Sequence, residues 1–111
     1  MDKKLYITRK ISDGSGRLEY YLTEKTYTDI DGTACGTVFG VEIVKMGRSA
    51  DGAECVQTGV ADDLSVSREC VLEFIYLLNN MEVMPVGLAD VVEDLMEEDF
   101  FILSNKREEA A

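Results

Sequence analysis

The sequence predicts an α+β fold: a four-stranded antiparallel β-meander followed by two C-terminal α-helices packed on one face of the sheet. Two observations lead to this prediction. Apolar and polar residues alternate with a period of two through the first 60 residues, with Gly-containing turns between the segments, which is typical of half-buried strands. Beyond them the apolar residues recur at helical spacing, and a length of 111 residues suits one domain.

The strand-like half contains four alternating segments joined by short connections. In the first segment, Leu5 and Ile7 are expected to share one face of the sheet. Asp31-Gly32 predicts a hairpin turn, because Gly reaches positive φ without strain; the same segment lacks the remaining ligands of a calcium loop. We expect strands over 4–11, 17–28, 33–46 and 53–60.

The helical half begins at Ser67, a residue type that caps helix N-termini well. In the following stretch, 70–78, eight of nine residues are apolar, so this helix is expected to be covered on more than one side. Pro85 opens a second, amphipathic helix that is expected to run from about 86 to 104 with its acidic side in water. We expect one domain over 1–105 and a disordered tail over 106–111.

The composition excludes several classes of function. There is no His, which removes Ser-His-Asp and Cys-His catalysis and every His-ligated metal site, so we expect a protein that is not an enzyme and has no cofactor. The three Cys, at 35, 55 and 70, lack metal-ligand or redox spacing and are expected to be small buried residues. No apolar run approaches the roughly 20 residues of a membrane span, and no secretory signal is visible, which predicts a cytoplasmic protein.

The charge is uneven along the chain. Residues 1–60 contain nine acids and eight bases, whereas residues 61–111 contain thirteen acids and three bases. Direct binding to nucleic acid is therefore not expected, even though Tyr and basic residues alternate on the first two strands. The acidic residues of the second helix are most simply a solvated face, with a divalent-cation site as the alternative.

These features favour a non-enzymatic protein-interaction module that binds a partner protein or a second copy of itself. The candidate interaction surface combines the apolar first helix with the acidic second helix: Val71, Phe74, Ile75, Leu78, Asp94, Glu97 and Glu98. A tight intramolecular core is the alternative explanation for the apolar residues. Two further functions stay open, namely an acidic nucleic-acid mimic that inhibits a basic protein, and a binder of a small ligand or divalent metal.

Short motifs in both halves resemble a known family. The stretch Leu77-Leu78-Asn79, then Val83, Pro85, Leu88 and Asp90-Val91-Val92-Glu93-Asp94, together with Gly40-Val41-Glu42-Ile43, is similar to a family of small clostridial proteins of unknown function. The resemblance implies a small cytoplasmic protein with N-terminal strands and C-terminal helices. It implies no activity and no catalytic residues.

Overall fold

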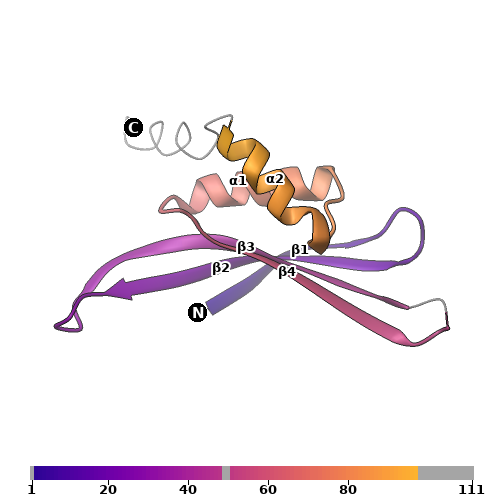
Figure 1. The fold of residues 1–111 in the computed structure, drawn as a ribbon, viewed down its shortest axis with the longest axis horizontal. Helices are drawn as coiled ribbons and strands as arrows, with labels where there is room; N and C mark the ends of the chain where they lie inside the picture. The colour runs from indigo at the N-terminus through magenta and orange to yellow at the C-terminus, as the bar shows by residue number, and fades with distance from the viewer. Residues whose placement is uncertain (1, 49–50, 98–111) are drawn as a thin grey trace.

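The computed structural model describes residues 2–48 and 51–97. Four strands form one antiparallel sheet in the order β1-β2-β3-β4, and two helices joined by a short 3₁₀ turn follow them. Figure 1 shows both helices on the same side of the sheet, while the other side carries none of the described elements. This confirms the predicted fold class. The elements are β1 (Asp2–Lys10), β2 (Gly16–Thr28), β3 (Ala34–Arg48), β4 (Glu54–Ser65), α1 (Arg68–Asn80), η1 (Pro85–Gly87) and α2 (Leu88–Glu97).

The predicted hairpin turn between the second and third strands is confirmed. Gly32 has φ +81°, and its N–H donates to the carbonyl of Asp29. The Asp29 side chain accepts hydrogen bonds from the N–H groups of Asp31 and Thr33, so the turn is held locally. The last two strands are longer than predicted and end at Arg48 and Ser65.

A β-bulge in β1 corrects one sequence-based expectation. The register with β2 shifts between Leu5 and Ile7, so that Leu5 pairs with Tyr21 and Ile7 pairs with Tyr20. Because paired residues share a face and the period along a strand is two, the extra residue, Tyr6, sends Leu5 and Ile7 to opposite faces. The prediction that they share a face was wrong.

The core lies between α1 and the covered face of the sheet. Leu18, Tyr20, Val41 and Ile43 on the strands are fully buried. From α1 the same layer receives Cys70, Val71, Phe74, Ile75 and Leu78, each at most 1% exposed. The helix begins as predicted: the Ser67 hydroxyl accepts a hydrogen bond from the Cys70 N–H at 3.1 Å.

The second helical segment begins with a single 3₁₀ turn, and only then continues as α2. Pro85 lies against Gly59 of β4: a Cβ on Gly59 would be 2.5 Å from the Pro85 carbonyl oxygen. This close approach brings η1 onto the sheet, and α2 then packs along β4. The predicted continuation of this helix to 104 and the predicted tail over 106–111 lie outside the described residues.

Within the described residues, no helix combines the length and apolar character needed to cross a membrane.

Candidate interaction surface

The apolar part of the predicted surface is not on the surface. Val71, Phe74 and Leu78 are 0% exposed and Ile75 is 1% exposed, all facing the sheet. The expectation that they contact a partner was wrong, and the intramolecular core explains the apolar composition of α1. Of the acidic part, Asp94 is exposed on α2; the side chain of Glu97 and the whole of Glu98 lie outside what the structure describes.

The cysteines also separate. Cys70 is buried in the core as predicted, whereas Cys55 is exposed on β4, so the expectation for Cys55 was wrong. Edge strands such as β4 have no neighbour on one side, which leaves their side chains more open to solvent. The side chain of Cys35 lies outside the described residues.

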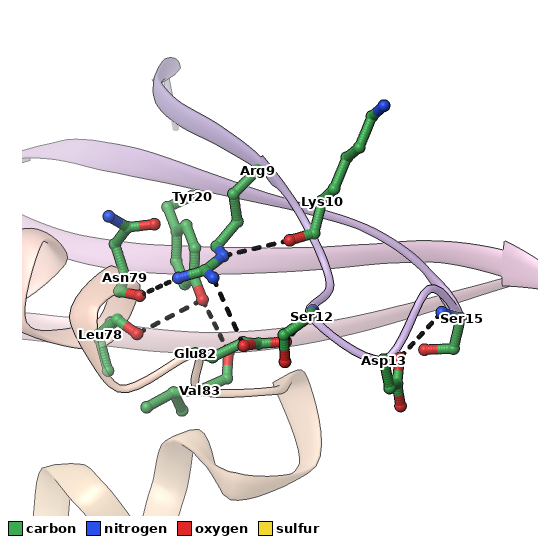
Figure 2. A network of polar contacts seen from close by, with 10 residues as sticks. All are labelled: Arg9, Lys10, Ser12, Asp13, Ser15, Tyr20, Leu78, Asn79, Glu82 and Val83. Atoms are coloured by element: carbon green, nitrogen blue, oxygen red, sulfur yellow. Dashed lines mark hydrogen bonds and ion pairs between the residues drawn. The ribbon is translucent and has the colours of Figure 1, made fainter.

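One cluster of polar contacts fastens the end of α1 to the end of β1 (Figure 2). The Glu82 carboxylate accepts hydrogen bonds from the Ser12 N–H at 2.7 Å and the Ser12 hydroxyl at 3.1 Å. It also lies 3.4 Å from the Arg9 guanidinium, which donates to the Asn79 carbonyl at 2.5 Å. A cation at the C-terminus of a helix interacts favourably with its free carbonyls. The cluster therefore caps the C-terminus of α1 and connects it to the end of β1.

The backbone explains why an acidic residue occupies this position. Val83 N–H donates to the Leu78 carbonyl, and Glu82 N–H donates to the Asn79 carbonyl, which is the Schellman pattern at a helix end. Glu82 then has φ +51°, where glycine is the usual residue. Its contacts to Ser12 and Arg9 offset the backbone strain, which is on the order of 1–2 kcal/mol. This is a structural role rather than a catalytic one.

Tyr20 lies beneath the same cluster. Its hydroxyl donates to the Val83 carbonyl at 3.1 Å, and the Leu78 carbonyl lies 3.4 Å away. Burial, as the main cause, raises the pKa of Tyr20 to about 12. The hydroxyl thus stays protonated and donates to the Val83 carbonyl, just beyond the end of α1.

We predict that Glu82→Gln lowers stability at neutral pH and flattens the acid limb of the unfolding profile. The Ser12 backbone and side-chain hydrogen bonds hold the pKa of Glu82 below its ordinary value of 4.5. A lowered folded-state pKa gives stability that is present above pH 4.5 and is lost as pH falls through the lowered value. Chemical denaturation from pH 7 to pH 3 measures this. Glu93→Gln, at an exposed position on α2, is the control, and equal acid limbs for Glu82→Gln and wild type would contradict the assignment.

The face of the sheet opposite the helices does not contribute to the core. The register places Tyr21, Glu42 and Val60 in one row across this face, and Met46 and Val56 in another. We call six apolar residues of this face the open-face band. They are Leu5, Tyr21, Val44, Met46, Val56 and Val60, of which Leu5, Val56 and Val60 are 45%, 65% and 47% exposed.

The two sides of the molecule differ in charge. By register, the open face carries five bases and three acids, namely Lys3, Lys10, Arg17, Lys25, Arg48, Glu19, Glu42 and Glu54. A fourth acid, Asp63, accepts a hydrogen bond from the open-face Tyr27 hydroxyl. Among the side chains that the structure describes, the helical layer over 66–95 carries one base and six acids: Arg68, Glu69, Glu73, Glu82, Asp90, Glu93 and Asp94. Within the described ranges, the helical layer is therefore more acidic than the open face. Among the described residues, no three potential metal-ligating side chains converge.

Comparison with known proteins bears on the predicted family. No curated protein and no solved structure matches the chain. A family model described as a family of unknown function (DUF6514) matches residues 2–98, which includes every strand and helix of the fold. The predicted membership in a family of unknown function is thereby confirmed: the chain belongs to the family of unknown function DUF6514.

Proposed function

We propose that this domain is a non-enzymatic protein-interaction module and that it binds a partner protein through the open face of its sheet. One observation supports this most strongly. The open-face band exposes large apolar side chains on both edge strands and has half-buried ones on the two strands between them, while α1 and α2 cover the other face. An exposed apolar patch framed by polar residues is typical of a protein-binding surface.

The contacts on this face support a preorganised surface. Lys3 forms an ion pair with Glu42 at 2.6 Å and lies over the Tyr21 ring, 4.7 Å from its centroid. The Tyr21 hydroxyl donates to Glu19 at 3.0 Å. These contacts fix polar side chains beside the apolar ones, and a surface ordered before binding loses less entropy when a partner arrives.

The test is recovery of partner proteins from the native host with tagged wild-type chain and with Leu5→Gln/Val60→Gln. Each substitution is expected to remove about 1.5 kcal/mol of the binding free energy that comes from burying an apolar side chain in the complex. Recovery of the partner should therefore fall at least about tenfold. Val86→Gln is the matched control, because Val86 is 80% exposed on the helical side. Equal recovery with Leu5→Gln/Val60→Gln and wild type, both folded by circular dichroism, would count against the proposal.

A second candidate is the acidic mimic that binds a basic protein. The observation in its favour is that Asp90, Glu93 and Asp94 are exposed on α2 at positions i, i+3 and i+4, where side chains share one face of a helix. Asp90→Asn/Glu93→Gln/Asp94→Asn separates the two candidates. Loss of the recovered partner in this variant, with retention in Leu5→Gln/Val60→Gln, identifies the helical side as the binding surface.

A further inference from the structure

Three basic side chains at one end of the sheet have no ion pair or aromatic contact within the described part of the chain: Lys10, Lys45 and Arg48. The other six described bases each have one. Lys3, Arg9 and Arg17 pair with carboxylates, and Lys4, Lys25 and Arg68 contact tyrosine rings. Lys45 pairs in register with the core residue Leu18 and lies on the helical side of the sheet, so the unpaired basic cluster of the open face is Lys10 and Arg48. In a chain with twice as many acids as bases, such a cluster is unexpected.

A shallow cavity of about 660 Å³ lies beside this cluster. It is lined by one cation from each of three neighbouring strands, namely Lys10 of β1, Arg17 of β2 and Arg48 of β3. Met46 and Val56, two members of the open-face band, line the same cavity. The cavity is therefore continuous with the surface proposed above to bind a partner.

The cations at this site oppose one another. Lys10 and Arg17 are direct register partners, and like charges placed opposite each other across two strands are destabilising. The carboxylate nearest to Arg17 is that of Glu19, at 4.0 Å. Glu54, the one acidic residue among the described residues that line the cavity, pairs in register with Arg48 but forms no ion pair with it. An anion in the cavity would relieve this repulsion.

We propose that the cavity binds an acidic segment of the partner protein: a carboxylate of the segment contacts Lys10, Arg17 and Arg48, and an adjoining apolar side chain packs on Met46 and Val56. This inference rests on the proposed function. The mixed lining favours a protein segment over a free anion, because a free anion would leave the two apolar side chains in water.

The experiment is an NMR titration of the ¹⁵N-labelled chain with the synthetic peptide acetyl-Glu-Val-Glu-Val-Glu-amide. We expect saturable shifts of the Gly16, Gly47 and Arg48 amides, and an affinity that falls as salt rises. Lys10→Gln/Arg48→Gln is expected to lower the affinity for the peptide at least about tenfold, since hydrogen bonds to charged groups contribute roughly 1.5–3 kcal/mol each. Lys25→Gln, a base on the same face that contacts Tyr27 instead of the cavity, should leave affinity unchanged.

Three results would overturn the inference: no saturable shifts, equal affinity of Lys10→Gln/Arg48→Gln and wild type, or equal shifts with inorganic phosphate at the same concentration. The last result would identify a small-anion site instead. The proposed function is tested by other residues, because Leu5 and Val60 do not line the cavity. If partner recovery is lost in Leu5→Gln/Val60→Gln but unchanged in Lys10→Gln/Arg48→Gln, the interaction surface stands and the acidic-segment site is wrong.

Discussion

Phe74→Ala is expected to lower the free energy of unfolding by about 3–5 kcal/mol, the range found when a buried aromatic residue is truncated. Phe74 is 0% exposed at the centre of the layer between α1 and the sheet, where it shares a cluster with Tyr20, Val41 and Ile43. The cost has two sources. The apolar surface of the ring is no longer buried, and a rigid sheet on one side prevents the cavity from closing.

Chemical denaturation of the Phe74→Ala variant measures this change, with Tyr76→Ala as the control on the same helix. Tyr76 is 55% exposed, so its truncation is expected to cost less than about 1 kcal/mol. A domain of this size has a total stability of only about 5–15 kcal/mol, so Phe74→Ala should also show a much lower thermal midpoint. Similar costs for the two variants would contradict the placement of Phe74 in the core and Tyr76 outside it.

Gly59→Ala is expected to cost about 1–3 kcal/mol, the range typical of overpacking. The added Cβ would lie 2.5 Å from the Pro85 carbonyl oxygen and 3.0 Å from its Cα and carbonyl carbon. All three neighbours are backbone atoms, so the strain cannot be relieved by a side-chain rotation. Either β4 bends or η1 moves off the sheet, and Leu88, which is 2% exposed, then loses part of its packing.

Gly87→Ala is the matched control, because the nearest atom to a Cβ there is Cγ1 of Val83 at 3.9 Å, an ordinary contact. Replacing Gly by Ala where the backbone permits it typically stabilises by about 0.4–1 kcal/mol through the unfolded state. Denaturation midpoints of the two variants are therefore expected to move in opposite directions. A Gly59→Ala protein as stable as wild type would show that η1 does not lie on β4 as described.

Local patterns were enough to predict the four strands and the two helices, but not the 3₁₀ turn η1 between the helices. The change from a period of two to a helical period separated the sheet from the helices, and Ser67 located the start of α1 because its hydroxyl caps the helix. The position of α1 over the sheet also followed, since a helix apolar on most sides must be buried. The prediction that the apolar residues of α1 form an exposed binding surface was wrong, because the burial of a helix depends on which elements pack over it.

Features that depend on neighbouring strands were not visible in the sequence. The bulge at Tyr6 depends on the pairing of β1 with β2, and it alone decides that Leu5 belongs to the open face. The role of Glu82 required the end of β1 to lie beside the end of α1, although the two residues Ser12 and Glu82 are 70 positions apart. The open-face band likewise joins residues from all four strands, so no short motif could identify it.

The most direct test of the open face as the binding surface is photo-cross-linking from defined positions. Benzoylphenylalanine is introduced at Thr58, which is exposed and pairs with Val44 on the open face, or at Val86 on the helical side. Cells of the native host are irradiated, and cross-linked partners are identified by mass spectrometry. The predicted result is that one specific protein is cross-linked from position 58 and that this protein is not cross-linked from position 86. A specific partner cross-linked from position 86 and absent from position 58 would contradict the account.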